Sequence, residues 1–203
     1  GTRLMALADA AEAAGSNRIR LTPHQKLLVL DVDPARVDAL LTAAEALGLT
    51  ATPGPFRRHT MACTGIEYCK LAFVDTKDTA TAAVATLDRR LADLGLDVPI
   101  SLNVNGCPNS CARIQVADIG LKGQIAKSPD GTDEFAFQVH LGGGLASADR
   151  EEAGVGRTLR GLKITAEQLP DYVERITRRF ATDREPGESF AHWAHRADEE
   201  ALR

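Results

Sequence analysis

The first part of the chain shows a helical pattern of apolar residues, then two strand-like patterns, then a second helical one. Apolar side chains recur at helical spacing over residues 2–14, which predicts a helix. Residues 18–22 alternate and residues 27–32 form a β-rich apolar run, so two strands are expected. Asp33 precedes a second helical pattern over 34–47 and is placed to cap it. We expect a small helix–strand–strand–helix unit whose sheet edge needs a partner.

A turn-forming segment, Thr52-Pro53-Gly54-Pro55, separates this unit from the rest of the chain. Beyond it, helical and strand-like patterns follow one another without internal repeats. The sequence predicts an α+β fold, with residues 1–55 as a small ferredoxin-like half-domain and 56–203 as a larger α+β domain. The expected elements of the larger domain are a helix over 79–94, strands over 100–104 and 135–141, a helix over 169–180, and a last helix pinned by Phe190 and Trp193.

Composition narrows the class of protein. The 203 residues are 44% hydrophobic, enough to bury a core. The net charge of −4, without runs of like charge, argues against a nucleic-acid partner. No apolar stretch reaches the roughly 20 residues that cross a bilayer, and no secretory signal is present, so we expect a cytoplasmic protein without a membrane span. Because Gly1 stands where Met would start a chain and a helix follows at once, we expect a piece of a longer protein.

The four cysteines form two close pairs, Cys63 with Cys69 and Cys107 with Cys111. Disulfides are disfavoured in the reducing cytosol. A structural zinc site usually has two to four residues between paired ligands, which the five-residue gap of the first pair does not match. Unrelated buried thiols would not come as two close pairs. An iron–sulfur cluster, which takes four thiolates from loops, is the interpretation that the spacing favours.

The motifs around these cysteines resemble the sulfite and nitrite reductase family that uses sirohaem beside a [4Fe-4S] cluster. Nearly the whole chain is covered by the resemblance, which identifies it as the C-terminal half of such an enzyme. The resembling segments are residues 61–65 (MACTG) with Cys69, 105–111 (NGCPNSC), 118–123 (DIGLKG), 140–143 (HLGG), and 18–22 (RIRLT) with Gln25.

The resemblance assigns a role to each cysteine. Cys63, Cys69, Cys107 and Cys111 would bind the cluster, and Cys111 would also bridge to the sirohaem iron as the catalytic thiolate. It further implies a two-half fold in which this chain is the second half, the N-terminal half is a partner, and ferredoxin is the electron donor. Most of the cationic substrate cage belongs to the absent half, so the isolated chain is expected to turn over substrate poorly.

Six further residues are predicted to bind cofactor, and for each of them a simpler structural explanation is also open. Asn105 and Asn109 flank the second cysteine pair, where asparagine also serves ordinary turn chemistry. Arg58 lies near the first pair and could bind a sirohaem carboxylate, although a surface arginine is the default. The other three resemble half-domain positions that face the cofactor, or are simply exposed: Arg18, Arg20 and Gln25.

The predicted function is the six-electron reduction of sulfite to sulfide at sirohaem, coupled to the cluster through Cys111. Two alternatives stay open. One is nitrite reduction to ammonia by a member of the same family. The other is a non-catalytic iron–sulfur electron carrier, which needs the cysteines and no macrocycle.

Overall fold

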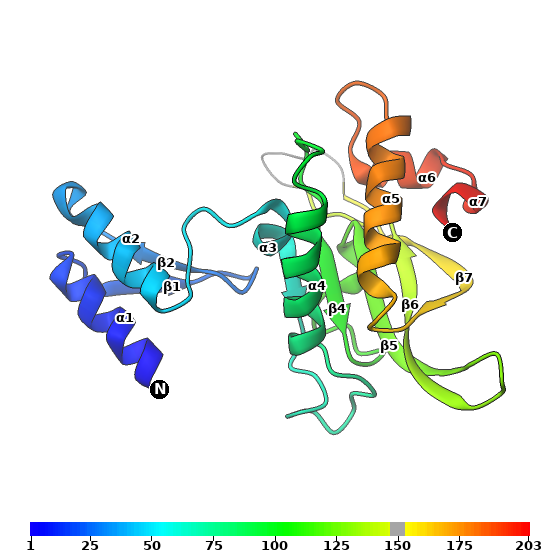
Figure 1. The fold of residues 1–203 in the computed structure, drawn as a ribbon, viewed down its shortest axis with the longest axis horizontal. Helices are drawn as coiled ribbons and strands as arrows, with labels where there is room; N and C mark the ends of the chain where they lie inside the picture. The colour runs from blue at the N-terminus through cyan, green and yellow to red at the C-terminus, as the bar shows by residue number, and fades with distance from the viewer. Residues whose placement is uncertain (147–152) are drawn as a thin grey trace. The chain divides into compact units, whose positions relative to one another are not determined.

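The computed structural model describes residues 1–146 and 153–203 (Figure 1). The chain divides into two compact units, Gly1–Pro53 and Gly54–Arg203. The division falls inside the proline- and glycine-containing segment at residues 52–55.

The first unit has the expected helix–strand–strand–helix order. Its elements are α1 (Thr2–Ala13), β1 (Arg18–Leu21), β2 (Leu27–Leu30), the 3-10 turn η1 (Pro34–Arg36) and α2 (Val37–Ala46). The strands pair antiparallel. β2 ends earlier than predicted because Asp31 adopts a left-handed backbone conformation, with a φ of 55°. The Asp33 side chain accepts a hydrogen bond from the Ala35 N–H at 2.9 Å, which confirms the predicted cap.

The hairpin of the first unit carries apolar side chains that the unit leaves uncovered. All four residues of β1 are exposed, and Leu21 keeps 80% of its surface accessible. Leu28 on β2 is exposed as well. A two-stranded sheet with an uncovered apolar surface is marginal alone, which agrees with the expectation of a packing partner.

The second unit is built on a mixed five-stranded sheet in the order β3-β4-β5-β6-β7. β3, β4 and β5 run parallel to one another, and β6 and β7 continue the sheet antiparallel. The sequence predicted β4 and β6 but not the other three strands. The strand bounds are β3 Thr60–Ala62, β4 Leu102–Asn105, β5 Ile119–Lys127, β6 Asp133–Leu141 and β7 Arg157–Ile164.

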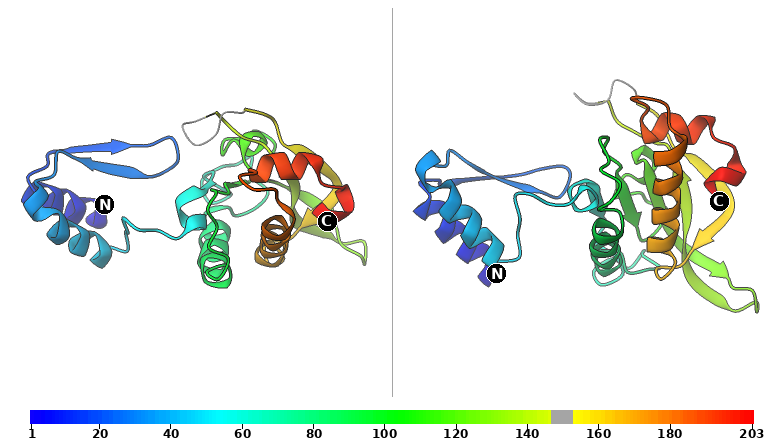
Figure 2. Two further views of the ribbon diagram at one scale, coloured as in Figure 1. Left: turned by 90° about the horizontal axis from the view of Figure 1, so that it is seen from above. Right: turned by 45° about the horizontal axis from the view of Figure 1, so that its top comes forward.

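Two helices, α4 (Lys77–Arg90) and α5 (Leu169–Asp183), cover one face of this sheet. Figure 2 (left) looks nearly along both helices and shows them on the same side of the strands. The apolar positions of the strands, such as Leu102 and Val139, join the helices in one hydrophobic core. Because side chains alternate along a strand, the residues between them, such as Asn103 and His140, belong to the opposite, polar face.

The C-terminal segment packs through aromatic rings. α6 (Phe190–Arg196) confirms the predicted last helix, and α7 (Glu199–Leu202) follows it. The rings of Phe180, Phe190 and Trp193 lie 5.3–5.6 Å apart between centroids and are almost wholly buried. Two short elements complete the unit, α3 (Pro55–His59) and η2 (Ile114–Val116). The fold is α+β, as predicted.

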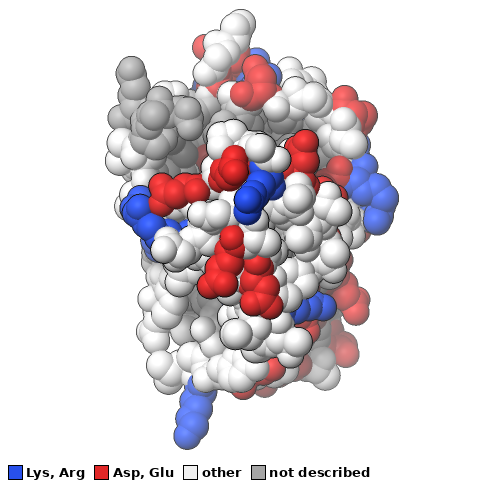
Figure 3. Space-filling model, turned by 90° about the vertical axis from the view of Figure 1, so that its left-hand side faces the viewer, with Lys and Arg blue, Asp and Glu red and all other residues white. Residues whose placement is uncertain are grey.

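On the face shown in Figure 3, acidic and basic side chains are interspersed among uncharged ones. In the described parts of the chain, no helix combines the length and apolar character that a bilayer span demands.

Candidate iron–sulfur site

The two cysteine pairs follow two neighbouring parallel strands. Cys63 comes directly after β3, and Cys107 lies two residues beyond the end of β4. Since β3 and β4 are paired in parallel, their carboxyl ends lie at the same edge of the sheet. Sites in sheets of this kind form at the carboxyl ends of parallel strands. The strand pairing therefore brings the two cysteine loops to one edge.

Three hydrogen bonds join the first cysteine loop to the end of β4 and to the second cysteine loop. The Cys63 N–H donates to the Val104 carbonyl at 3.0 Å, and the Phe73 N–H donates to the Gly106 carbonyl at 2.8 Å. The Gly106 N–H donates to Cys63 Sγ at 3.2 Å. Gly106 permits this approach because a Cβ there would lie 2.8 Å from that of Ala72. A backbone N–H aimed at a cysteine sulfur stabilises a thiolate.

Backbone hydrogen bonds stabilise the turn that contains Cys69. The Cys69 N–H donates to the Gly65 carbonyl at 3.0 Å, and the Ala72 N–H donates to the Cys69 carbonyl at 3.1 Å. Gly65 has a φ of 80°, a conformation that glycine adopts without the strain of a side chain. The segment from Cys63 to Ala72 is therefore a folded turn.

The side chain of Asn105 forms hydrogen bonds to the backbone of the second cysteine loop. Its side chain is completely buried, donates to the Cys107 carbonyl at 2.7 Å, and accepts from the Ala112 N–H at 2.7 Å. The loop also contains two non-glycine residues at positive φ, Ser110 and Arg113. Such conformations cost free energy and are found where the surroundings impose them. The result is a rigid loop in which Cys107 is buried and Cys111 is exposed.

A donor set of four cysteines is the one that iron–sulfur clusters take. All are free thiols. Among residues 1–146 and 153–203, no three His, Cys, Asp or Glu side chains are arranged to bind one metal ion. A cubane spreads its thiolate ligands over a larger core and is tuned by N–H donors to sulfur, as at Cys63.

Comparison with known proteins decides the family. The family model for the nitrite and sulphite reductase 4Fe-4S domain matches residues 54–203. The model for the nitrite/sulfite reductase ferredoxin-like half domain matches residues 1–47. The chain belongs to the nitrite and sulphite reductase family. This confirms the resemblance seen in the cysteine motifs, and the predicted cofactors, a [4Fe-4S] cluster and sirohaem, are those of this family.

Within the reductase family, the chain is more similar to sulfite than to nitrite reductases. It is 56% identical over its full length to sulfite reductase [ferredoxin] 1 of Mycolicibacterium paratuberculosis, covering 36% of that protein. It is 32% identical over 97% of its length to an assimilatory ferredoxin-dependent nitrite reductase of Haloferax mediterranei, covering 32% of it. The solved structure of Mycobacterium tuberculosis NirA matches the whole chain with a TM-score of 0.94 at 51% identity, over 37% of its own length. The chain thus spans about a third of these reductases.

The other predicted cofactor residues are exposed in the structure. Arg18 forms an ion pair with Asp31 at 2.8 Å, and Arg20 lies on the same exposed strand. Gln25 occupies the hairpin turn with a φ of 58°. Arg58 on α3 and Asn109 in the second loop are exposed. Their contacts with cofactor stay predictions, as does direct binding by Asn105, whose amide is engaged with the loop.

The polar face of the sheet contains a buried histidine. His140, 8% exposed, lies 3.0 Å through Nδ1 from the Thr158 hydroxyl. Burial lowers the pKa of His140, and the charge of Lys122 lowers it further. The folded chain therefore favours the neutral imidazole of His140. It belongs to the HLGG segment of the family motifs.

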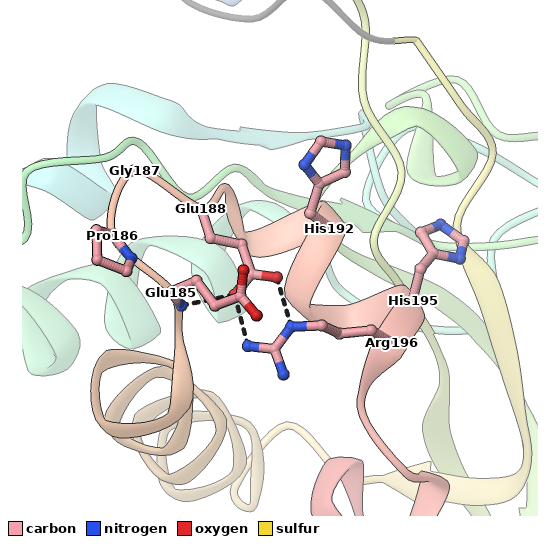
Figure 4. Close-up of a pocket in the computed structure, with 7 residues that line it drawn as sticks. All are labelled: Glu185, Pro186, Gly187, Glu188, His192, His195 and Arg196. Carbon is pink, nitrogen blue, oxygen red and sulfur yellow. Dashed lines mark hydrogen bonds and ion pairs between the residues drawn. The ribbon is translucent and has the colours of Figure 1, made fainter.

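A shallow pocket of about 560 Å³ lies at the start of α6, lined by the seven residues drawn in Figure 4. Its main charges are already paired, because Arg196 forms two hydrogen bonds to Glu188, at 2.6 and 2.7 Å. This pair lowers the pKa of Glu188. No cysteine lines the pocket, and we assign it no function.

Proposed function

We propose that this chain is the cofactor-binding part of a ferredoxin-dependent sulfite reductase, in which Cys63, Cys69, Cys107 and Cys111 bind one [4Fe-4S] cluster. The observation that carries the proposal is the bond from the Gly106 N–H to Cys63 Sγ, which links the two cysteine loops. Sulfite is favoured over nitrite because the sulfite reductases are 51–56% identical to the chain, against 32–36% for the nitrite reductases.

We propose that Cys111 is the residue that would be shared with sirohaem. It is the exposed member of the set, whereas Cys107 is buried, so its sulfur is accessible to a group outside the loop. The sirohaem–cluster pair supplies the electron transfer for reducing the bound anion when both groups are present. The chain's own contribution is to hold the four thiolates on rigid loops and to donate an N–H to one of them.

The remainder of the site would come from the segment of the relatives that this chain does not match. We propose that this N-terminal part packs with the chain, supplies the cationic substrate cage, and completes the ferredoxin-like pair with the uncovered hairpin of the first unit. Arg18, Arg20, Gln25 and Arg58 would then face the macrocycle, whose carboxylates require basic partners. The isolated chain is expected to hold a cluster and to reduce sulfite poorly.

A chimera tests the proposal. In it, this chain replaces the matching C-terminal segment of the Mycobacterium tuberculosis sulfite reductase, to which it is 51% identical throughout. We expect a sirohaem absorption spectrum and methyl-viologen-linked sulfite reduction. The Cys111→Ser chimera should lose activity, while Ser128→Ala, a change in the exposed β5–β6 turn, should not. A folded chimera that binds no sirohaem would contradict the proposal, and so would full activity of the Cys111→Ser chimera.

A further inference from the structure

Thr76 stands at the N-terminus of α4, where threonine normally caps a helix with its hydroxyl. Here the side chain makes no capping hydrogen bond. The neighbouring Asp75 takes over that role, because its carboxylate accepts from the Asp78 N–H at 3.3 Å. The hydroxyl of Thr76 is thus free for another contact.

That contact is with Cys63. Thr76 is completely buried, and its hydroxyl donates to the Cys63 carbonyl at 2.7 Å. The same oxygen lies 3.7 Å from Cys63 Sγ. Gly65 leaves room for it, since a Cβ at Gly65 would lie 2.7 Å from the hydroxyl oxygen. The geometry holds the hydroxyl against both the backbone and the sulfur of one cysteine.

Cys63 is therefore constrained from two sides. The Gly106 N–H donates to its sulfur, and the Thr76 hydroxyl donates its single proton to its carbonyl. Because a hydroxyl has one proton, and this proton is in the bond to the carbonyl, Thr76 acts on the sulfur by orienting Cys63 and not as a second donor. Donors around cluster sulfurs stabilise the more negative, reduced state and raise the reduction potential.

We propose that Thr76 is a positioning residue for the cluster: it fixes the orientation of Cys63 so that the sulfur stays on the Gly106 N–H, and this donor raises the reduction potential of the cluster that Cys63 binds. The inference rests on the proposed function. It adds a residue outside the cysteine motifs and links the start of α4 to the electronic properties of the cluster.

The test compares variants of the chain carrying a reconstituted cluster. Thr76→Val removes the hydroxyl at nearly constant volume, and Thr76→Ser retains it. We expect Thr76→Val to lower the midpoint potential in a redox titration and to release iron to a chelator roughly 10-fold faster, since loss of an outer-shell partner commonly weakens metal binding by that order. Thr76→Ser should stay close to the unsubstituted chain in both measurements.

The matched control is Thr81→Val on the same helix. Thr81 is exposed and its hydroxyl donates to the Lys77 carbonyl at 2.8 Å. This variant should leave the potential and the iron release unchanged. A purely structural role for Thr76 would leave the potential unaltered, so equal potentials for Thr76→Val and the unsubstituted chain would overturn the inference.

If Thr76→Val does not fold, a second variant tests the same inference. Gly65→Ala inserts a methyl group against the Thr76 hydroxyl and should displace it from Cys63, lowering the potential in the same direction. An unchanged potential in a folded Gly65→Ala chain overturns the inference. Failure of the unsubstituted chain to take up any cluster is a different result, because it overturns the proposed function and the inference with it.

Discussion

Asn105 shows how one buried amide can define a ligand loop. Its amide donates to the Cys107 carbonyl and accepts from the Ala112 N–H, so it satisfies two backbone groups that would otherwise lack a partner inside the protein. A buried polar group left without a partner costs about 1–3 kcal/mol. The asparagine is therefore important to the loop even without touching a cofactor.

Replacing Asn105 with Leu should destabilise the chain by roughly 2 kcal/mol, because it leaves the Cys107 carbonyl and the Ala112 N–H unpaired. Urea unfolding of the cluster-free chain measures the change. Asn109→Ala, at an exposed position of the same loop, is the control and should stay within about 0.5 kcal/mol. Equal midpoints for the two variants would show that Asn105 does not hold the loop.

The lowered pKa of His140 predicts that the stability of the chain depends on pH. Its pKa is lowered in the folded chain, so the folded state keeps the neutral imidazole while the unfolded state takes up a proton near pH 6.5. Stability is thus retained above this pH and lost as the pH falls toward the lower folded value. His140→Gln should reduce the loss of unfolding free energy between pH 7 and pH 5.

The measurement is urea unfolding at several pH values in that range. His192→Gln, at an exposed position on α6, provides the comparison. If the chain and its His140→Gln variant lose stability in parallel as the pH falls, the buried neutral state of His140 is refuted.

At the residue scale, the sequence could identify the cysteines but not their supporting contacts. Two close pairs in glycine- and asparagine-containing loops are a chemical signal that needs no coordinates. Thr76 carries no such signal, since a threonine before a helix reads as an ordinary cap. Its contact with Cys63 depends on the packing of segments that only the folded chain brings together.

The elements were predictable where periodicity was strong. α5 and β6 have clear helical and alternating patterns, and both were found near the predicted bounds. β5 was missed because Gly120 and Gly123 interrupt its alternation. Both glycines are required by close backbone approaches, from Ile114 to Gly120 and from Gly106 to Gly123. β3, only three residues long, is specified by its pairing with β4 rather than by its own sequence.

The aromatic contact between α5 and α6 should be a main source of stability for the second unit. Phe180 has no exposed surface and packs against both Phe190 and Trp193. Phe180→Ala should cost about 3–5 kcal/mol in chemical unfolding, because it removes a buried ring and leaves a cavity. Phe135→Ala on the exposed side of β6, where 61% of the side chain is accessible, should cost far less. Similar costs for both would contradict the described core.

At the scale of the whole molecule, the two units differ in how complete they are. Gly54–Arg203 has a continuous core between its sheet and helices, whereas Gly1–Pro53 leaves an apolar hairpin exposed. The chain also spans only about a third of the reductases it matches. These facts support the proposal that an additional part supplies the substrate chemistry.

The central claim is that four thiolates from two loops bind one iron–sulfur cube. Iron and acid-labile sulfide analysis of the chain after anaerobic reconstitution, read together with its absorption spectrum, tests it most directly. We expect about four iron and four sulfide per chain and a broad cubane absorption shoulder at roughly 400 nm. A colourless chain containing zinc, or a folded chain that retains neither iron nor sulfide, would contradict it.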